Sequence, residues 1–280
     1  MITQNQKRIQ VLLVTGILTN EHNPENNLLL RRMLEATGLF KVKITEEFRG
    51  ATAETLESYD LVLVNYDGKE TVHDPAVRLG EQSEQLLLDF VRAGKGIIFY
   101  HSSVFREAWP NEEFVKMMGI CFDFKKGSRK ALFDDMKVKI TAHPHPITAN
   151  LDKTSWYTVQ EDLFVPAYRL PDANVEVLAT VFDDINEYQK VPAHMDKEYS
   201  LDDIQNYHGI NAEQPVAWVN RYGEGRVFVI TIGHASESIK RPGFVALFCR
   251  GAEWAATGQV TLPPPNLSGE NRFLTWPYYA

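Results

Sequence analysis

Three of the eight histidines stand where a group that binds a ligand would be useful. His101 and His234 each come at or just after the end of an apolar run, and His22 lies in the loop after a third such run. Neutral imidazole is a common metal ligand and also carries protons near neutral pH, so both roles stay open. A shared metal would place the donor nitrogens roughly 3–4 Å apart, because each lies about 2.1 Å from the ion. Imidazoles that only line one pocket could stand up to about 10 Å apart.

Polar groups that could work beside these histidines come from two places. Asn65 and Asp67 follow the apolar run LVLV, where they either reach a ligand or close a turn. Glu161 and Asp162 end a strand-like run, and adjacent strand residues point to opposite faces. If the pair is not simply solvated, only one of them enters a site, and we predict that it is Glu161. We assign catalysis to His101, Glu161 and His234, and metal binding to His22, His101 and His234.

Two serines follow the apolar run GIIFY, where α/β hydrolases carry a nucleophile on a sharp turn. With His234 as the base and Glu237 as its orienting group, Ser102 or Ser103 would complete a triad in chain order. That turn needs flanking glycines, however, and the sequence YHSSV supplies none. We therefore predict that the serines cap the following helix or bind substrate hydroxyls. Asn65 is also predicted to bind substrate.

The runs that carry these residues alternate with helical patterns in the first hundred residues. Short apolar runs predict buried strands, and apolar residues that recur three and four positions apart predict helices. The alternation predicts βαβ crossovers and an α/β fold with a doubly wound, mainly parallel sheet. Ligands bind such sheets outside the carboxyl ends of the strands, which is the edge that the three histidines would share. Strands are predicted at 9–14, 41–45, 61–64 and 96–100, and helices around 28–34 and 86–91.

The second half of the chain has strand patterns without long helices between them, which predicts an antiparallel extension of the sheet. These strands are expected at 137–141, 156–163, 176–182 and 216–220. A hairpin turn then leads into the apolar run 226–232, which is apolar enough to join the N-terminal sheet, and a last helix spans Phe244 to Ala255. We therefore predict a single domain over residues 1–261.

Residues 183–215 form a long polar segment with many Asp and Glu. A structureless stretch of this length is uncommon in a compact domain, so a long loop or lid against the histidine edge is predicted. Tyr207 and His208 would then reach the site as substrate contacts. Residues 262–280 are rich in proline and aromatic residues, and we expect a tail laid over the surface.

The composition excludes several classes of partner. The 280 residues include 29 Lys plus Arg and 37 Asp plus Glu, a net charge of -8, so nucleic acid and anionic membranes are not expected partners. No stretch approaches the ~20 apolar residues of a spanning helix, and the N-terminus lacks a signal-peptide pattern. Cys121 and Cys249 belong to no CxxC pattern and are predicted to be buried thiols, which suits a cytoplasmic protein.

Several phrases, in this order, resemble the trehalose-utilisation (ThuA-like) family over about residues 11–258. They are GKG followed by IIFYHSS, HPIT, the acidic pair Glu161-Asp162, PVAW and GEGRVFVITIGH. The resemblance implies a class I glutamine amidotransferase-like fold, trehalose-like disaccharides or keto-glycosides as substrates, and a correspondence of His22, His101 and His234 with recurrent family histidines. The sequence departs from the family at Tyr100, where a smaller residue is usual, and in the longer segment 183–215. The amidotransferase cysteine is missing, so glutaminase activity is not implied.

Three functions stay open. The leading one is a sugar-modifying enzyme, an isomerase or hydrolase, in which a divalent metal such as zinc polarises a small-molecule carbohydrate while Glu161 moves a proton. The second is metal-free hydrolysis through Ser102 or Ser103. The third is a non-catalytic sugar-binding or regulatory protein, since a fold does not fix a function. A homo-oligomer is compatible with each of them.

Overall fold

The computed structural model describes residues 7–16, 24–69, 75–133, 135–151, 155–188 and 201–264. The strands of its large sheet are β1 (Ile9–Val14), β2 (Phe40–Thr45), β3 (Leu61–Val64), β4 (Gly96–Tyr100), β7 (Lys137–Ile140), β8 (Ser155–Tyr157), β11 (Glu176–Phe182), β12 (Glu213–Tyr222) and β13 (Gly225–Ile230). Two smaller ribbons are built from β5 (Ile120–Cys121) with β10 (Tyr168–Arg169), and from β6 (Arg129–Phe133) with β9 (Glu161–Val165). The helices are α1 (Pro24–Ala36), α2 (Ala53–Glu57), α3 (Glu81–Arg92), α4 (Glu112–Met118), α5 (Ile185–Tyr188), α6 (Leu201–Ile204), α7 (Ser236–Ile239) and α8 (Pro242–Thr257), with 3-10 turns η1 (His101–Val104) and η2 (Phe124–Lys126).

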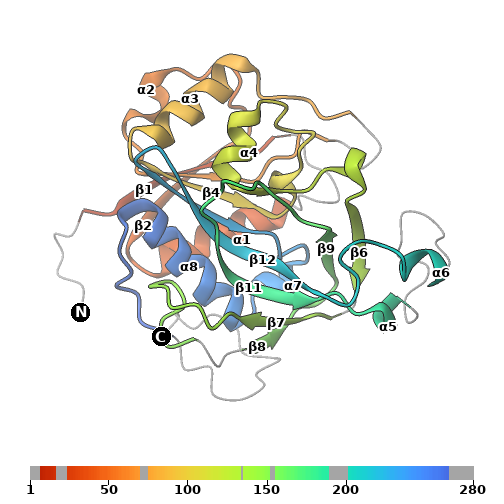
Figure 1. Ribbon diagram of the computed structural model, residues 1–280. Helices are drawn as coiled ribbons and strands as arrows, with labels where there is room; N and C mark the ends of the chain where they lie inside the picture. Colours follow the sequence, from red (N-terminus) through yellow and green to blue (C-terminus); the bar gives the residue numbers. More distant parts are fainter. Residues whose placement is uncertain are drawn as a thin grey trace.

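The large sheet has nine strands in the order β2-β1-β3-β4-β13-β12-β11-β7-β8 (Figure 1). The first five are parallel to their neighbours, and the last four continue the sheet in antiparallel fashion. The predicted α/β fold with a parallel half and an antiparallel extension is confirmed. The late apolar strand β13 pairs with β4 in the middle of the sheet, as expected from its composition.

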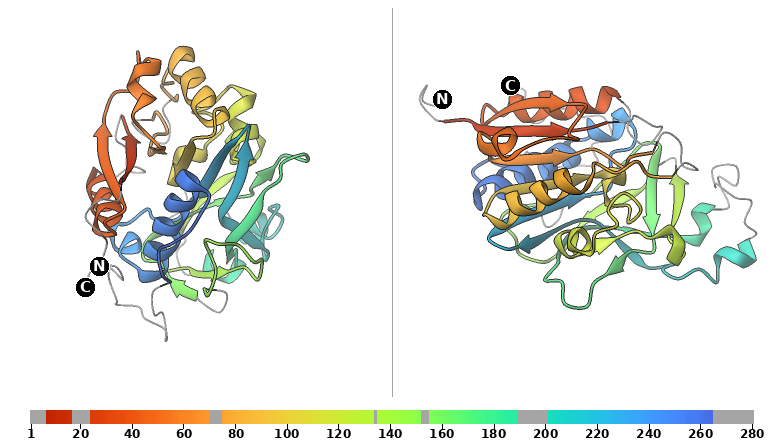
Figure 2. Two further views of the ribbon diagram at one scale, coloured as in Figure 1. Left: turned by 90° about the vertical axis from the view of Figure 1, so that its left-hand side faces the viewer. Right: turned by 90° about the horizontal axis from the view of Figure 1, so that it is seen from above.

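Helices cover both faces of the sheet (Figure 2). On one face α1 and α8 pack their apolar stripes, with Leu30 and Phe248 fully buried, because their apolar residues recur at helical spacing. On the other face α3 and α4 bury Leu87 and Phe114 in a second cluster. No helix in the described part of the chain is long and apolar enough to cross a membrane.

Both cysteines are buried, as predicted. Burial raises the pKa of the Cys121 thiol to about 11 and raises the pKa of Cys249 further. Neither thiol therefore ionises near neutral pH, so neither is an activated nucleophile.

The ribbon of β6 and β9 differs from the sequence prediction. A single strand was expected at 156–163, but the chain forms β8, turns at Gln160 with a φ of 46°, and starts β9 at Glu161. The two strands belong to different sheets. Because a turn separates them, Glu161 and Asp162 begin a strand rather than ending one.

The segment between β11 and β12 leaves and re-enters the sheet at the carboxyl end of the parallel strands. The register places Phe182 beside Glu213, and Ala217 beside Ile230 near the end of β13. In Figure 2 the teal helices α5 and α6 lie at that end of the molecule. The described parts of this insertion, 183–188 and 201–212, therefore lie at the same edge as His101 and His234.

Candidate functional site

Two neighbouring parallel strands deliver His101 and His234 to one place. Ile230 of β13 pairs with Tyr100 of β4, and each histidine comes within four residues of that pair. His101 starts η1 with a φ of 52°, an uncommon conformation for a residue other than glycine. Gly233, with a φ of 112°, makes the turn before His234, and a Cβ there would lie 2.8 Å from the Tyr100 hydroxyl. His101 is thus held in an uncommon backbone conformation, as is common at functional sites, and the turn before His234 requires glycine.

The two imidazoles meet the carboxylate of Asp162. His101 Nε2 lies 3.2 Å from His234 Nδ1, and Asp162 Oδ2 lies 3.1 Å from that Nδ1 and 3.7 Å from His101 Nε2. His101 Nδ1 is 2.8 Å from the Thr231 carbonyl oxygen, which can only accept, so Nδ1 carries the proton. The lone pair of the neutral His101 ring is therefore on Nε2, which faces the other two groups.

Asp162 is ionised although its side chain is fully buried. Burial opposes ionisation, but the neighbouring His234, Lys130 and His101 outweigh it and hold the pKa of Asp162 below its ordinary value. Within the described residues, neither carboxylate oxygen receives a well-directed hydrogen bond. A buried charge of this kind is stable only when it is paired or bound to a metal.

Glu161 is not the carboxylate nearest to the imidazoles, which corrects the expectation from the sequence. Its Oε2 accepts a hydrogen bond from the Gly233 N–H and its Oε1 accepts one from the His234 N–H, both at 2.8 Å. Burial raises the pKa of Glu161 to about 7. The two residues do alternate along β9, but Asp162 is the one that faces the histidines, while Glu161 binds the backbone that carries His234.

Asn26, in the first turn of α1, holds the same backbone from the other side. Its Nδ2 donates to the Gly233 carbonyl at 3.3 Å and to the His234 carbonyl at 2.9 Å. The Tyr100 hydroxyl also donates to the Gly233 carbonyl. Glu161 thus accepts the N–H groups of Gly233 and His234, and Asn26 donates to their C=O groups. These side chains fix the His234 backbone in place of the hydrogen bonds of a β-sheet.

Three donor atoms in this arrangement have the spacing of a metal site. His101 Nε2, His234 Nδ1 and Asp162 Oδ2 stand 3.1–3.7 Å apart, and ligands about 2.1 Å from one ion stand roughly 3–4 Å apart. Two imidazoles with one carboxylate form the facial triad that leaves further coordination positions open. The hydrogen bond from His101 to Thr231 is the outer-shell contact that orients a ligand histidine. The His234 side chain is 24% exposed, so the open side can be reached from outside.

The serines and Asn65 have structural partners. The Ser103 hydroxyl donates to the Val64 carbonyl and accepts from the Tyr66 N–H, and the Asn65 amide donates to Asn27 Oδ1. The Ser102 hydroxyl donates to Asp67 Oδ2 at 3.1 Å. Glu237 is exposed on α7, and the carboxylate that stands at His234 is Asp162 instead. The alternative triad of a serine, His234 and Glu237, which the missing flanking glycines already disfavoured, is therefore not assembled.

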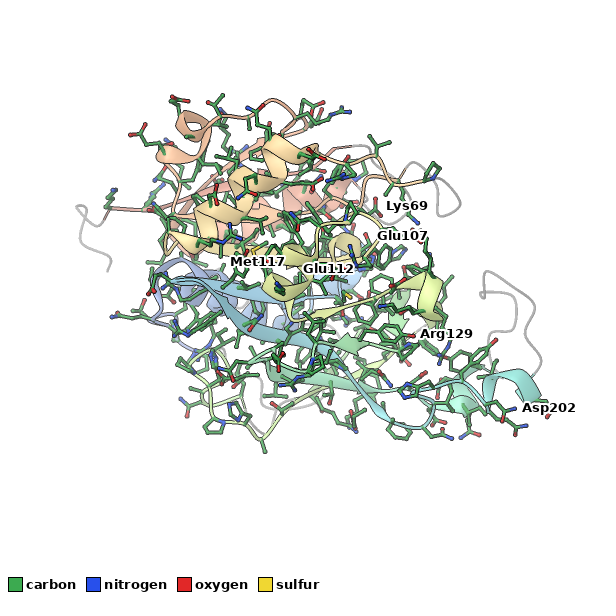
Figure 3. The ribbon with its side chains drawn as sticks, turned by 45° about the horizontal axis from the view of Figure 1, so that its top comes forward. Lys69, Glu107, Glu112, Met117, Arg129 and Asp202 are labelled. Atoms are coloured by element: carbon green, nitrogen blue, oxygen red, sulfur yellow. The ribbon has the colours of Figure 1, made fainter. Side chains whose placement is uncertain are left out.

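Two residues after Asp67 in the chain, Lys69 forms an ion pair with Glu107. Figure 3 shows both side chains on the same side of the molecule. The Lys69 side chain is 9% exposed, and its ammonium lies 5.8 Å from the centre of the Phe124 ring. This pair packs the ends of the β3 and η1 loops together.

The insertion contacts the ribbon next to the site. Tyr207 faces the Arg129 guanidinium at 4.8 Å from its ring centre, whereas His208 is exposed. Arg129 lies on β6 beside Lys130, so the two side chains point to opposite faces of the ribbon. Figure 3 shows Arg129 on the side of the molecule that carries α6. His22 lies outside the described residues.

The sequence did not single out Lys130. Its ammonium lies 3.7 Å from Asp162 Oδ2, and its side chain is only 9% exposed. In the sequence, Lys130 lies in the alternating run RKALF, and such a pattern usually places a charged side chain in solvent. The sequence therefore offered no reason to assign it to the site. Only the pairing of β6 with β9, more than thirty residues away in the chain, turns this lysine inward.

This protein is therefore an α/β protein that carries two histidines and a carboxylate at the carboxyl edge of its sheet. The sequence profile of the ThuA family, described as trehalose utilisation, matches residues 10–255, and the chain is a member of that family. Membership supports a carbohydrate-related role.

Solved structures show the same fold. A ThuA-like protein from Parabacteroides merdae ATCC 43184 aligns with a TM-score of 0.71 at 23% identity, covering 98% of this chain and 100% of its own. A ThuA-like protein from Bacteroides uniformis ATCC 8492 gives 0.59 at 17% identity and covers 100% of both chains. Cytoplasmic protein STM1381 from Salmonella typhimurium LT2 gives 0.55 at 15% identity, with coverage of 88% and 99%. Among curated proteins no significant match is found.

Proposed function

We propose that this protein is a metal-dependent enzyme that modifies a carbohydrate, with His101 Nε2, His234 Nδ1 and Asp162 as the ligands of one divalent ion such as zinc. The observation that carries the proposal is the 3.1–3.7 Å spacing of the three donor atoms around a buried carboxylate. Membership of the ThuA family supports a sugar as the substrate. By resemblance to the family, the substrate is a trehalose-like disaccharide or a keto-glycoside.

The ion would polarise a carbonyl or hydroxyl oxygen of the sugar as a Lewis acid. The chain's own residues hold the ligands in place for this. Thr231 fixes the His101 ring, and Glu161 with Asn26 fixes the backbone of His234. We assign Glu161 to positioning rather than proton transfer, because both of its oxygens already accept backbone N–H groups.

Two alternatives are weaker on the same geometry. The serine hydrolase considered from the sequence needs a serine hydroxyl directed at a histidine base, but the Ser103 hydroxyl donates to the Val64 carbonyl and that of Ser102 to Asp67. A sugar-binding protein without catalysis would need neither an ion nor a strained backbone at His101. Turnover is therefore the property that separates the proposal from both.

The experiment compares metal-free and metal-loaded protein. Chelator-treated protein is reloaded with zinc or manganese and incubated with trehalose and with keto-disaccharides, and the products are followed by chromatography. We expect turnover only in the loaded protein and its loss in Asp162→Asn. The control is Asp135→Asn, an exposed aspartate in the turn after β6, which should leave turnover unchanged. Sugar binding without turnover in the loaded protein would support the non-catalytic alternative, and turnover that survives removal of metal would contradict the proposal.

A further inference from the structure

Two consecutive residues at the end of β4 bind the chain beyond the end of β13. The backbone pairing of these strands ends at Tyr100, and side chains continue the connection. His101 Nδ1 donates to the Thr231 carbonyl at 2.8 Å, and the Tyr100 hydroxyl donates to the Gly233 carbonyl. Neighbouring residues of one strand thus bind alternate carbonyls of the other. The second of these carbonyls belongs to the residue directly before His234.

The Tyr100 ring is held in place by close packing, so its hydroxyl is a fixed point. The residue is 1% exposed, and its ring packs edge-on against Phe244 of α8 with the ring centres 6.4 Å apart. A Cβ on Gly233 would lie 2.8 Å from the Tyr100 hydroxyl and 2.9 Å from the Phe244 ring. The turn before His234 is therefore packed directly on the pair of Tyr100 and Phe244.

The main chain at His234 controls the position of the proposed ligand atom. His234 presents Nδ1 to the cluster, 3.2 Å from His101 Nε2 and 3.1 Å from Asp162 Oδ2. Nδ1 is bonded to the ring carbon that carries Cβ, whereas Nε2 stands farther out on the ring. Rotation of the side chain therefore corrects a displaced main chain less well for Nδ1 than it would for Nε2. Because ligand distances must hold within about 0.2 Å, a small shift of this turn would disturb the site.

We propose that Tyr100 is a positioning residue of the metal site, and that its hydroxyl sets the place of His234 Nδ1 relative to His101 Nε2. The inference rests on the proposed metal-dependent function and adds a residue to it. Tyr100 is joined through the chain to one ligand histidine, and through its hydroxyl to the turn that carries the other. A single side chain thus relates the two imidazoles, and it acts through the Gly233 carbonyl rather than by contact with the ion.

The Gly233 carbonyl keeps a donor when the Tyr100 hydroxyl is removed. Asn26 Nδ2 also donates to this oxygen, at 3.3 Å. A buried carbonyl with one remaining donor is still satisfied, so loss of the hydroxyl does not leave an unpaired polar group in the interior. We therefore expect a protein without this hydroxyl to fold, with a turn that is held less firmly before His234.

The experiment compares the wild type with Tyr100→Phe, which removes one oxygen atom and keeps the ring that packs against Phe244. Each protein is loaded with Co²⁺, because the visible absorption of this ion changes with the positions of its ligands. At saturating cobalt we expect the bands of Tyr100→Phe to differ from those of the wild type in position or intensity. Zinc affinity, measured by competition with a fluorescent chelator, should fall by about 10-fold. This is the lower end of the range for an outer-shell partner, because Asn26 still binds the same carbonyl.

The control is Tyr222→Phe, which removes the hydroxyl of another buried tyrosine. The Tyr222 hydroxyl donates to Glu113 at 2.6 Å, and Tyr222 pairs with Gly225 at the start of β13. It therefore stands at the opposite edge of the sheet from His234. Its loss should lower the urea midpoint of unfolding, as the loss of a buried hydrogen bond does, and should leave the cobalt spectrum and the zinc affinity unchanged.

Identical cobalt spectra and zinc affinities in the wild type and in folded Tyr100→Phe would overturn the inference and leave the proposed function intact. Equal changes in Tyr222→Phe would also overturn it, since the effect would then follow general stability. A wild type that binds neither cobalt nor zinc would overturn the proposed function and the inference with it. If Tyr100→Phe does not fold, Gly233→Ala decides, because its Cβ would press on the same hydroxyl. A folded Gly233→Ala protein with the wild-type cobalt spectrum would contradict the inference.

Discussion

His101 Nε2 and His234 Nδ1 lie 3.2 Å apart although 133 residues separate them in the chain. The distance is set by topology, because β4 and β13 are adjacent parallel strands that end at the same level. Asp162 reaches the same point from β9, which belongs to a different sheet. Three segments far apart in sequence thus converge on one point.

The first prediction concerns the carboxylate ligand. Asp162→Asn keeps the shape of the side chain but removes its charge, and loss of a ligand should cost more than the loss of an outer-shell partner. We expect zinc affinity, measured by competition with a fluorescent chelator, to fall by more than about 100-fold. Asp135→Asn is the exposed control. An unchanged affinity in Asp162→Asn would remove this aspartate from the metal site.

The second prediction concerns Glu161. Glu161→Gln replaces one of the two oxygens that accept the Gly233 and His234 N–H groups, which leaves a buried donor facing another donor. We expect a loss of about 1–3 kcal/mol in the free energy of unfolding and a fall of roughly 10–100-fold in zinc affinity. Urea unfolding and chelator competition measure the two effects. A loss of stability with full zinc affinity would show that Glu161 does not position His234.

The third prediction concerns the anchor of the insertion. Arg129 binds Asp183 at 2.8 Å and Tyr188 at 3.1 Å, and both charged side chains are buried. Arg129→Met or Asp183→Asn leaves one buried charge alone, so each should lower the free energy of unfolding by about 3–5 kcal/mol. The double variant should lose less than the sum, since neither charge remains. Additive losses in urea unfolding would show that the two residues do not act as a pair.

The fourth prediction concerns pH. The pKa of Glu113 is lowered to about 2, first by the hydrogen bond from Lys116 and then by that from Tyr222. A lowered carboxyl pKa stabilises the fold above the ordinary value of 4.5, and the gain is lost as the pH falls towards 2. Wild type should therefore be more stable than Glu113→Gln at pH 7, and the urea midpoints should converge as the pH falls from 4.5 towards 2. A gap that stays constant over this range would contradict the assignment.

The fold could be predicted from the sequence because its central strands are short, fully apolar runs separated by helical patterns. The same argument placed His101 and His234 at one edge, since parallel strands end together. The contacts of Glu113 with Arg92 and Tyr222 could not be foreseen, because Arg92 ends α3 and Tyr222 ends β12, and only tertiary packing brings them to α4.

The carboxylate and the lysine of the site could not be chosen from the sequence. Whether Glu161 or Asp162 faces the histidines depends on how the ribbon of β6 and β9 lies over the sheet, and that pairing joins residues far apart in the chain. An alternating run such as RKALF predicts a strand with exposed charges, and tertiary pairing overrides that expectation for Lys130.

The central claim is that His101, His234 and Asp162 hold a metal ion, and the direct measurement is the metal content of the protein purified without a histidine tag. Elemental analysis by mass spectrometry, after dialysis against metal-free buffer without chelator, should find about one divalent ion per chain in the wild type. The content should fall close to zero in Asp162→Asn protein that is folded by circular dichroism. A wild type free of divalent metal that also takes up none from added zinc would contradict the claim.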